Sequence, residues 1–342
     1  MVRTPSGKKR ATIRDVALLA DVSVASASRA INGLASVTDA TRDKVLEAAK
    51  MLRFVPHSGA RSLSTRQTST IGFVLPDLYG EFFSELIRGV DIAARAKGHH
   101  LLVSSSHGDV EEAALAMRSM RGRVDGILVM SPYIDAAVLA DNVDSDLPIV
   151  LLNTHGAGAR FPAYRVDNFG GAYAVTKHLL ETGRRKIAHV GGPPTNHEAQ
   201  ERRRGYEAAL GSQFTPHVAE GDFTEEGGRA ATLALAAVGS ERPDAIFAAN
   251  DTMAVGCLLA LGELGLCVPD DVALAGFDDI PLARLVRPSL TTVRVRIDEL
   301  GRKALERLVQ CIHDNTTSGP VEIISPELVV RCSSSPNANP RE

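Results

Sequence analysis

The sequence predicts a small all-α helix-turn-helix module at the N-terminus, followed by an α/β core of two doubly wound parallel-sheet lobes. Two short helices joined by a tight turn fall within the first 50 or so residues. From Thr70 onward, short apolar runs alternate with helix-length amphipathic segments, which is typical of parallel sheets covered on both faces. About 260 residues are too many for one such sheet, so we expect two lobes.

The N-terminal helices are predicted from their capping residues. Thr12 to Asp15 match the capping box [ST]-x-x-[DE], which opens a first short helix. Ser23 can cap a second helix from Val24 to about Asn32. Thr38 can cap a third helix that runs through Leu52, with its apolar residues at helical spacing. Three helices of this kind form one small core.

Charge is distributed unevenly along the 342 residues, although the formal net charge is only −3. Residues 1–66 hold 12 Lys and Arg against 5 Asp and Glu, whereas the remainder holds 26 against 36. A basic head on an acidic body suggests that the head meets a polyanion. A basic solvated arm without a partner is the alternative that charge alone leaves open.

Composition excludes several classes of protein. The four cysteines are far apart and include no C-x-x-C pair, so neither a disulfide framework nor a zinc site is expected. No run approaches the roughly 18 apolar residues of a membrane span, and the polar, basic N-terminus lacks the apolar core of a secretory signal. We therefore expect a cytoplasmic protein that has no membrane partner.

The second helix carries the residue types of a DNA-recognition helix. Val24, Ala25 and Ser26 face outward near its start, and Ser28 and Arg29 follow one turn later. Small side chains let a backbone approach base edges in the major groove, while an arginine can fork onto guanine or a phosphate. An ordinary three-helix core fragment is the alternative interpretation of this segment.

The core elements follow from apolar runs and amphipathic periodicity. Strands are predicted at 71–75, 100–104, 126–130, 149–152, 187–190, 245–248 and 272–276. Helices are predicted at 82–97, 111–120, 170–181, 202–210, 225–237, 251–264 and 298–311. Because ligands bind beyond the C-terminal ends of parallel strands, a cleft between the two lobes is the expected binding site.

Two segments of the N-terminal region carry a family pattern: TIRDVALLADVSVASASRAING at residues 12–33 and VTDATRDKVLEAAKMLRFVPHSGARSLST at residues 37–65. They resemble the headpiece of the lactose-repressor (LacI/GalR) family, whose pattern is roughly T-I-x-D-V-A-x-x-A-x-V-S-x-x-T-V-S-R-x-L-N. The first segment departs from this pattern conservatively at Ser26 and Ala27. Later segments with family counterparts include IGFVLPD, RRKIAHVGG, FAANDTMAVG, LAGFDDIPLA and PSLTTVRVRIDELG. The resemblance implies a dimeric cytoplasmic transcription regulator whose core is similar to the periplasmic binding proteins.

The resemblance also implies a hinge helix in the segment SGARSLS, residues 58–64. In the family, paired hinge helices enter the minor groove and a leucine at the position of Leu63 wedges into the central base step, which kinks the duplex. Gly59 weakens this helix, so we expect the segment to be helical only when the chain is bound to DNA. A flexible serine-rich linker is the alternative. The DNA-contacting residues implied by the resemblance are Thr12, Ser23, Val24, Ala25, Ser26, Ser28, Arg29, Asn32, Arg61 and Leu63.

Family motifs likewise imply the effector-binding residues. They are Asp77, Phe82, Phe83, Asn153 and Asp167 from the first lobe and its connections, and Arg202, Phe223, Asn250 and Asp278 from the second lobe. Carboxylates, amides and an arginine suit vicinal hydroxyls, and an aromatic face suits the C–H surface of a sugar. The alternatives are a structural Arg202–Asp278 ion pair, a core role for Phe223 and a helix cap at Asn250.

We therefore expect a sequence-specific repressor of carbohydrate uptake or catabolism genes, controlled by a sugar-like effector. The expected partners are a pseudo-palindromic operator and a second copy of the chain, with no cofactor or metal. A purine- or nucleoside-responsive corepressor-type regulator is the alternative. An enzyme or a sugar-transport protein is disfavoured, because no catalytic or metal motif and no export signal is found. The predicted domains are residues 1–57 (headpiece), 58–69 (hinge helix and linker), 70–331 (core, with lobe 1 at about 70–167 and 296–323 and lobe 2 at about 168–295 and 324–331) and 332–342 (disordered tail).

Overall fold

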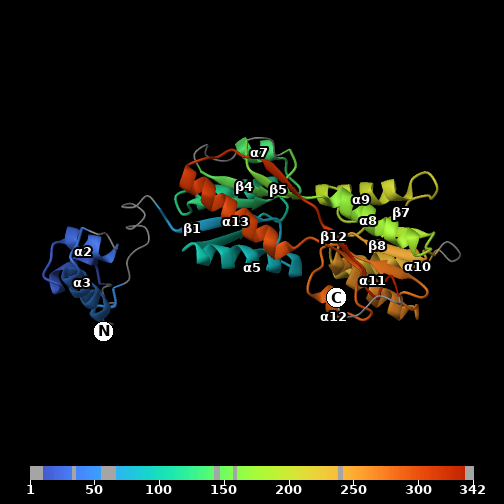
Figure 1. Cartoon of the computed structure of the whole chain (residues 1–342), viewed down its shortest axis with the longest axis horizontal. Helices are drawn as coiled ribbons and strands as arrows, with labels where there is room; N and C mark the ends of the chain where they lie inside the picture. Colours follow the sequence, from blue (N-terminus) through green and yellow to red (C-terminus); the bar gives the residue numbers. More distant parts are fainter. Residues whose placement is uncertain are drawn as a thin grey trace, which may run out of the picture. The chain divides into compact units, whose positions relative to one another are not determined.

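The computed structural model describes residues 11–32, 36–54, 67–141, 147–156, 160–237 and 242–335. The chain divides into two compact units, residues 1–68 and 69–342. Figure 1 traces both units in sequence colours. Within the described part of the chain, no helix combines the length and the apolarity that a bilayer crossing requires.

The first unit contains the three predicted helices: α1 (Ile13–Leu19), α2 (Val24–Ile31) and α3 (Asp39–Met51). Both halves of the capping box at Thr12 and Asp15 are formed. The α2 helix begins where the Ser23 hydroxyl accepts a hydrogen bond from the Ser26 amide, at 3.1 Å. The small apolar core that holds the helices together consists of Val16, Ala17, Ala20, Ala27, Ala30, Val45 and Ala48. The helix-turn-helix prediction is confirmed.

Replacing Thr38 by alanine is expected to cost about 1 kcal/mol of α3 stability, because the Thr38 hydroxyl caps the Thr41 amide at the start of that helix. Amide hydrogen exchange of the full-length chain would show the change as faster exchange in the first turns of α3. Thr41→Ala is the matched control, since the Thr41 hydroxyl lies 2.9 Å from that of Thr38 and bonds no backbone amide of the described residues. Equal exchange rates in the two variants would show that the cap contributes nothing.

The first lobe of the core is built on a six-stranded parallel sheet in the order β11-β5-β4-β3-β1-β2. The strands are β1 (Thr70–Leu75), β2 (His100–Ser105), β3 (Gly126–Met130), β4 (Ile149–Leu152), β5 (Ala163–Val166) and β11 (Val321–Ile324). Phe73 and Val74 are consecutive and fully buried, yet they belong to different core clusters. Since successive side chains of a strand point to opposite faces, helices must cover this sheet on both faces.

Four helices accompany the sheet of lobe 1: α5 (Glu81–Ala96), α6 (Val110–Met120), α7 (Ala136–Asp141) and α13 (Ile297–Asp314). The helices α5 and α13 pack on each other over one face, where Gly89 lets the two backbones meet, because a Cβ there would lie 2.2 Å from the Asp298 carbonyl oxygen. The α6 helix packs on β1 and β2 with the second core cluster, which covers the other face.

The second lobe has a four-stranded parallel sheet in the order β7-β6-β8-β9. Its strands are β6 (Ile187–Val190), β7 (His217–Ala219), β8 (Ala245–Ala248) and β9 (Ala273–Ala275). The helices are α8 (Asn168–Glu181), α9 (His197–Leu210), α10 (Glu225–Ala236), α11 (Asp251–Glu263) and α12 (Leu282–Leu285). The α8 helix packs on α9 and the α10 helix on α11, so this sheet is also enclosed in pairs of helices (Figure 1).

The chain passes between the lobes three times. It runs from β5 into α8, from β10 (Thr292–Arg294) into α13, and from β11 into β12 (Glu327–Val329). The strands β10 and β12 pair antiparallel and both contact α8, which places them with lobe 2. The prediction of two doubly wound parallel lobes is confirmed, whereas the predicted limits of each domain stay predictions.

The predicted disordered tail begins too early. Ser333 and Ser334 are both buried, at 1% and 2% exposure. The Ser333 hydroxyl donates to the Leu274 carbonyl at 2.6 Å, and its amide donates to the Ser289 carbonyl at 2.9 Å. These bonds attach the segment beside β9, where backbone groups need partners. The hydroxyls of Ser333 and Ser334 serve instead as hydrogen-bonding groups of the core.

Candidate functional site

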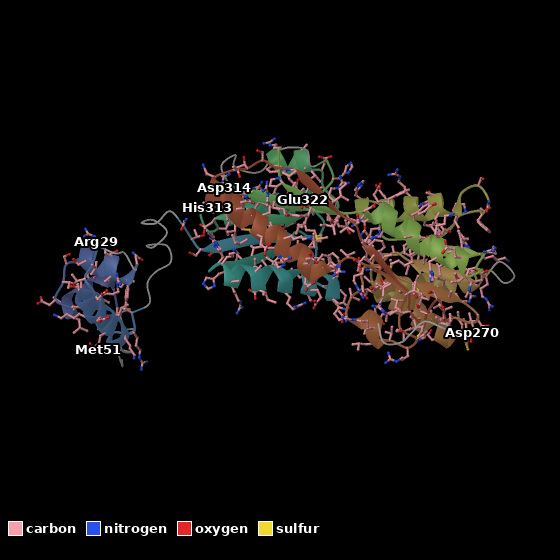
Figure 2. The ribbon with its side chains drawn as sticks, viewed as in Figure 1. Arg29, Met51, Asp270, His313, Asp314 and Glu322 are labelled. Atoms are coloured by element: carbon pink, nitrogen blue, oxygen red, sulfur yellow. The ribbon has the colours of Figure 1, made fainter. Side chains whose placement is uncertain are left out.

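The exposed face of α2 carries most of the predicted DNA-contacting residues. Val24, Ala25 and Arg29 are exposed, while Ala27 and Ala30 are buried against the other helices. Arg29 forms no ion pair with any described residue, so its guanidinium is available to a ligand (Figure 2). The geometry is that of a helix whose small and basic residues face away from the core, as groove recognition requires.

The polar residues around α2 already have local partners. The Thr12 hydroxyl donates to the Asp15 carboxylate at 2.8 Å, and the hydroxyls of Ser23 and Ser26 lie 2.9 Å apart. Asn32 ends α2 and reaches the Ser28 hydroxyl at 3.5 Å. These contacts fix the helix ends, and the lone pairs of the hydroxyls can still accept from a donor group on a base edge. Arg61, Leu63 and the predicted hinge helix lie outside the described residues.

A cleft of about 540 Å³ lies between the two lobes of the core. Its walls include seven of the nine predicted effector-binding residues, namely Asp77, Phe82, Phe83, Arg202, Phe223, Asn250 and Asp278. Lobe 1 contributes the connections after β1, β2 and β3 and the start of α5, and lobe 2 contributes α9, the start of α11 and the connections after β6, β7, β8 and β9. The expected position of the site, beyond the C-terminal ends of the strands, agrees with the structure.

Arg202 and Asp278 form a buried ion pair in the cleft. The Arg202 Nη2 lies 3.2 Å from the Asp278 Oδ1, and each residue is about 5% exposed. The Arg202 guanidinium also donates to the Asn168 side chain and the Ala249 carbonyl, and its Cζ lies 3.9 Å from the centre of the Phe277 ring. The structural ion pair is therefore real, and it stands in the wall of the cleft where an effector would meet it.

Buried carboxyl groups outnumber the arginine that pairs with them. Burial raises the pKa of Asp278 to about 7, against the opposing effect of the Arg202 charge. Burial likewise raises the pKa of Glu198, and burial together with the nearby Asp278 charge raises the pKa of Asp251. Asp251 is held by the Ile280 amide and the Thr292 hydroxyl rather than by a cation. Asp278 and Glu198 line the cleft, so a hydrogen-bond donor of a ligand would stabilise the charged forms that burial disfavours.

Asp278 makes the stability of the core depend on pH. Its pKa of about 7 in the folded chain lies above the ordinary value of 3.8, so between those values the folded state binds more protons than the unfolded state. Stability is then expected to increase as pH falls from about 8 to about 6. In Asp278→Asn, which mimics the protonated form, this increase should shrink. Thermal unfolding at both pH values would measure it, and an identical pH dependence in the variant would contradict the assignment.

Asn250 and Phe223 are held together by one amide. The Asn250 Oδ1 caps α11 by accepting from the Met253 amide at 2.8 Å, and the Nδ2 donates to the Phe223 carbonyl at 3.1 Å. The cap that the sequence offered as an alternative is therefore formed. Phe223 has a φ of 70°, and its ring rests where Gly192 has no side chain, since a Cβ there would lie 2.4 Å from the ring. Asn250 thus positions the aromatic wall of the cleft.

The lobe 1 wall is set by the loop before α5. The Asp77 carboxylate accepts from the Leu78 and Tyr79 amides and so shapes this loop. The Phe82 and Phe83 rings meet edge to face, with centroids 5.4 Å apart. Between them and the loop, the Glu81 carboxylate accepts from the Leu282 amide of lobe 2 at 2.9 Å, which ties the two lobes together next to the cleft.

Sequence reasoning missed several residues that line the cleft: Glu198, Tyr133, Asn196, Thr252 and His107. Tyr133 follows β3 just as Asp77 follows β1, so the strand-end rule could have found it. A hydrogen bond with the Asn196 side chain opposes the rise that burial causes in the pKa of Tyr133, and this bond joins lobe 1 to the start of α9. Glu198 follows two residues after Asn196, in the first turn of α9, and lines the same cleft.

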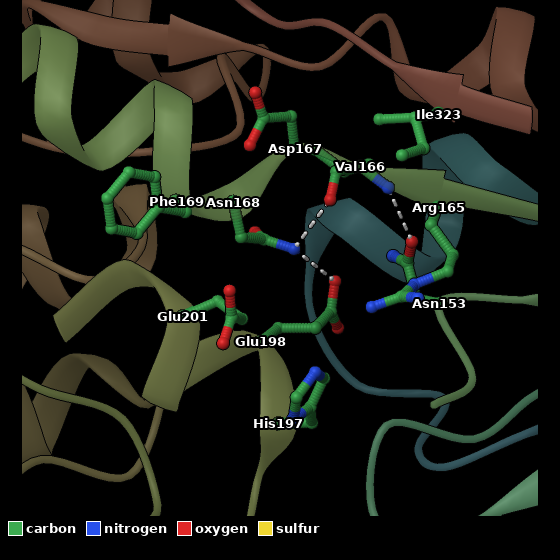
Figure 3. A pocket seen from close by; sticks show the side chains of 10 residues that line it. All are labelled: Asn153, Arg165, Val166, Asp167, Asn168, Phe169, His197, Glu198, Glu201 and Ile323. Atoms are coloured by element: carbon green, nitrogen blue, oxygen red, sulfur yellow. Dashed lines mark hydrogen bonds between the residues drawn. The ribbon is translucent and has the colours of Figure 1, made fainter. Parts of the chain in front are cut away.

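Asn153 and Asp167 are not brought together with the other seven predicted residues. They line a separate cavity of about 180 Å³ (Figure 3). The Asn153 Oδ1 accepts from the Val166 amide at 3.1 Å, and the Asp167 Oδ1 caps α8 by accepting from the Gly170 amide at 2.8 Å. Both side chains are held at the crossover from β5 to α8, which turns them away from the cleft. That these two residues bind the effector stays a prediction.

The described residues contain no group of three or more His, Cys, Asp or Glu side chains that could hold a metal ion. The residues that line the cleft offer hydrogen bonding, ion pairing and aromatic contact. It can bind a small molecule in contact with both lobes.

Known proteins are similar to this chain in both its N-terminal region and its core. Residues 12–57 match the family model described as "Bacterial regulatory proteins, lacI family", and residues 176–334 match a periplasmic binding protein-like domain. The chain is 34% identical to the transcriptional repressor PurR of Aliivibrio fischeri over 330 residues, which covers 94% of this chain and 98% of that protein. It is 33% identical to the ribose operon repressor of Haemophilus influenzae over 327 residues, with the same coverage.

Solved structures agree along the length of the chain. A lac repressor dimer bound to operator and the anti-inducer ONPF matches with a TM-score of 0.86 at 27% identity, covering 95% of this chain and 99% of that one. A complex of the transcriptional regulator CelR with cellobiose matches with a TM-score of 0.70 at 31% identity, covering 95% and 100%. The chain is a DNA-binding transcriptional regulator with an effector-binding core, and it belongs to the lacI family of bacterial regulatory proteins.

Proposed function

We propose that the chain represses genes of carbohydrate uptake or catabolism in the cytoplasm, and that its effector is a neutral sugar. The observation that carries the effector class is the charge of the cleft. Asp77, Glu198, Asp222 and Asp278 line it, whereas Arg202 is the one Lys or Arg among the described residues of its wall. Since Arg202 already pairs with Asp278, an anionic ligand would meet net repulsion.

The shape and polarity of the cleft favour a polyol. Carboxylates accept from vicinal hydroxyls, and the rings of Phe82 and Phe223 offer faces for the C–H surface of a sugar. A volume of about 540 Å³ has room for a mono- or disaccharide. The likeness to a ribose operon repressor and to a regulator solved with cellobiose supports this class.

A purine- or nucleoside-responsive regulator is the second candidate. The aromatic rings could stack on a base, and the relatives include repressors named PurR and CytR. The excess of carboxylates argues against a phosphorylated nucleotide but not against a free base or nucleoside. The two candidates therefore differ in the neutral ligand that the cleft accepts.

The proposed mechanism couples the cleft to DNA through the arrangement of the lobes. Two copies of the chain pair, as in the operator-bound lac repressor dimer, so that two α2 helices read a pseudo-palindromic operator. The effector contacts both lobes and shifts their equilibrium only by its differential affinity for the two arrangements. The predicted hinge segment at residues 58–69 would pass this change to the headpieces. No catalytic step and no cofactor is proposed.

A ligand screen distinguishes the candidates. Thermal unfolding of the full-length chain would be measured with ribose, glucose, cellobiose, glucose 6-phosphate, hypoxanthine and adenosine. We expect a neutral saccharide to raise the melting temperature and to change the affinity for operator DNA, with both effects lost in Asp278→Asn. Glucose 6-phosphate should do neither. If only hypoxanthine or adenosine acts, the carbohydrate assignment is wrong and the purine candidate replaces it.

A further inference from the structure

The smaller cavity, of about 180 Å³, lies where the lobes join (Figure 3). Asn153 and Arg165 line it from lobe 1, and Glu198 and Glu201 line it from α9 in lobe 2. Asp167, in the first crossover, completes its wall. Glu198 also lines the main cleft, so the two spaces are neighbours that share one side chain.

Asn153, which lines this cavity, carries a buried donor without a partner. Asn153 is 5% exposed, and its Oδ1 must be the atom that accepts from the Val166 amide, which fixes the orientation of the side-chain amide. The Nδ2 on the other side has no hydrogen-bond partner. A buried donor without a partner costs about 1–3 kcal/mol. The backbone of Asn153 is held as well, because its amide donates to the Tyr164 carbonyl at 2.9 Å.

Opposite charges stand on the two walls. Arg165 forms no ion pair with any described residue, and its positive charge lies on the same side of the cavity as the Asn153 donor. Across from them lie the carboxyl groups of Glu198 and Glu201 (Figure 3). Glu198 is buried, and its recorded hydrogen bond to Asn168 is a long one of 3.5 Å. Glu201 pairs with Arg204 on the solvent side of α9.

We propose that this cavity binds a small α-amino acid. Its carboxylate would accept from the Asn153 Nδ2 and from Arg165, and its ammonium group would donate to Glu198 and Glu201 and offset the negative charge that Asp167 adds. At roughly 30 Å³ for each water of the liquid, the cavity has the volume of about six waters, which suits a molecule the size of alanine or serine.

The ligand would act as a second effector. It touches both lobes and the crossover between them, so its binding energy favours the lobe arrangement described here over any arrangement in which these walls separate. Because Glu198 faces both spaces, occupation of the cavity and of the main cleft would be coupled, and the coupling is reciprocal. This goes beyond the single sugar effector of the proposed function.

Isothermal titration calorimetry on the full-length chain tests the site with L-alanine, L-serine and glycine, with L-lactate as a probe without an ammonium group and glycerol as a probe without a carboxylate. We expect at least one of the amino acids to bind and neither probe to bind. Binding of L-lactate as tight as that of L-alanine would contradict the role given to Glu198 and Glu201. Arg165→Gln should weaken binding of the acid at least about tenfold, which corresponds to 1.4 kcal/mol.

Two further variants make the test specific. Asn153→Asp keeps the acceptor for the Val166 amide but replaces the free donor with an acceptor, so it should also weaken binding. Arg203→Gln, whose arginine pairs with Glu207 on the outer side of α9, should bind the acid as the wild type does. The site is refuted if no acid binds, or if Arg165→Gln and Asn153→Asp both bind as tightly as the wild type. Operator binding and the saccharide response of the same preparation report separately on the proposed function.

Discussion

Replacing Arg202 by methionine is expected to lower the free energy of unfolding of the core by about 3–5 kcal/mol and to abolish the response to effector. Removal of one partner from a buried ion pair leaves the other charge without compensation, which is far costlier than losing both. Here the cost falls on two carboxyl groups, because Arg202 offsets the negative charges of Asp278 and Glu198. The Asn168 side chain and the Ala249 carbonyl also lose a donor.

Urea unfolding of the full-length chain, followed by circular dichroism, measures this effect. Arg203→Gln is the matched control, since the neighbouring Arg203 makes an exposed ion pair with Glu207 and should change stability by less than about 1 kcal/mol. If both variants unfold at the same urea concentration as the wild type, Arg202 is not holding the buried charges of the cleft.

Replacing Arg29 by alanine is expected to weaken operator binding by about 1–3 kcal/mol, or roughly 5- to 150-fold, and to relax selectivity at one base pair. The reason is that Arg29 is exposed on α2, has no ion-pair partner among the described residues and can fork onto a guanine edge. The operator would first be obtained by selecting tight-binding duplexes from random DNA with the wild-type chain.

Selection repeated with Arg29→Ala then shows whether one position of the consensus has become degenerate. Lys50→Ala, at the end of α3, removes the same charge away from the recognition helix and should weaken binding to all sequences alike. A variant that selects the wild-type consensus with undiminished stringency would show that Arg29 contacts no base.

The headpiece could be predicted almost completely from the sequence because its signals are local. A hydroxyl that accepts from the amide three residues later marks each helix start, and Thr12, Ser23 and Thr38 all cap as expected. The apolar strands of the core were equally clear, since strands buried on both faces read as continuous apolar runs. The strands β5, β7, β10, β11 and β12 were missed, because their three or four partly polar residues become strands only through long-range pairing.

The starts of two helices in lobe 2 were predicted too late in the chain. The α9 helix was expected from Arg202 and begins at His197, because Asn196 caps it at the end of a proline-containing loop. The extra turn matters for the site, since it carries His197, Glu198 and Glu201 to the junction between the lobes. The predicted helix at Gly170 likewise begins two residues earlier, where Asp167 caps α8.

Seven of the nine predicted effector-binding residues lie in one cleft, and the other two line a neighbouring cavity. Arg202, Asn250 and Asp278 meet in one cleft, as expected. Asn153 follows β4 and Asp167 follows β5, yet both turn toward the crossover, because each is held by a backbone amide there. Sequence alone does not tell to which side of a crossover a polar residue turns, since the backbone amide that it pairs with is known only from the folded chain.

Several residues have two roles, which sequence reasoning treated as alternatives. Asn250 caps α11 and also holds the Phe223 carbonyl at the wall of the cleft. Arg202 and Asp278 form a structural pair that also lines the cleft. A cap or an ion pair therefore does not argue against a functional site when the same group faces a cavity.

The proposed function requires that the headpiece recognise DNA selectively and that the core control this recognition. Fluorescence anisotropy of the full-length chain on the selected operator and on a scrambled duplex, at one fixed salt concentration, tests both. We expect the operator to bind at least about 10³-fold more tightly, and the saccharide found in the screen to change operator affinity about 5- to 150-fold. Equal affinity for the two duplexes, with and without that saccharide, would contradict the account.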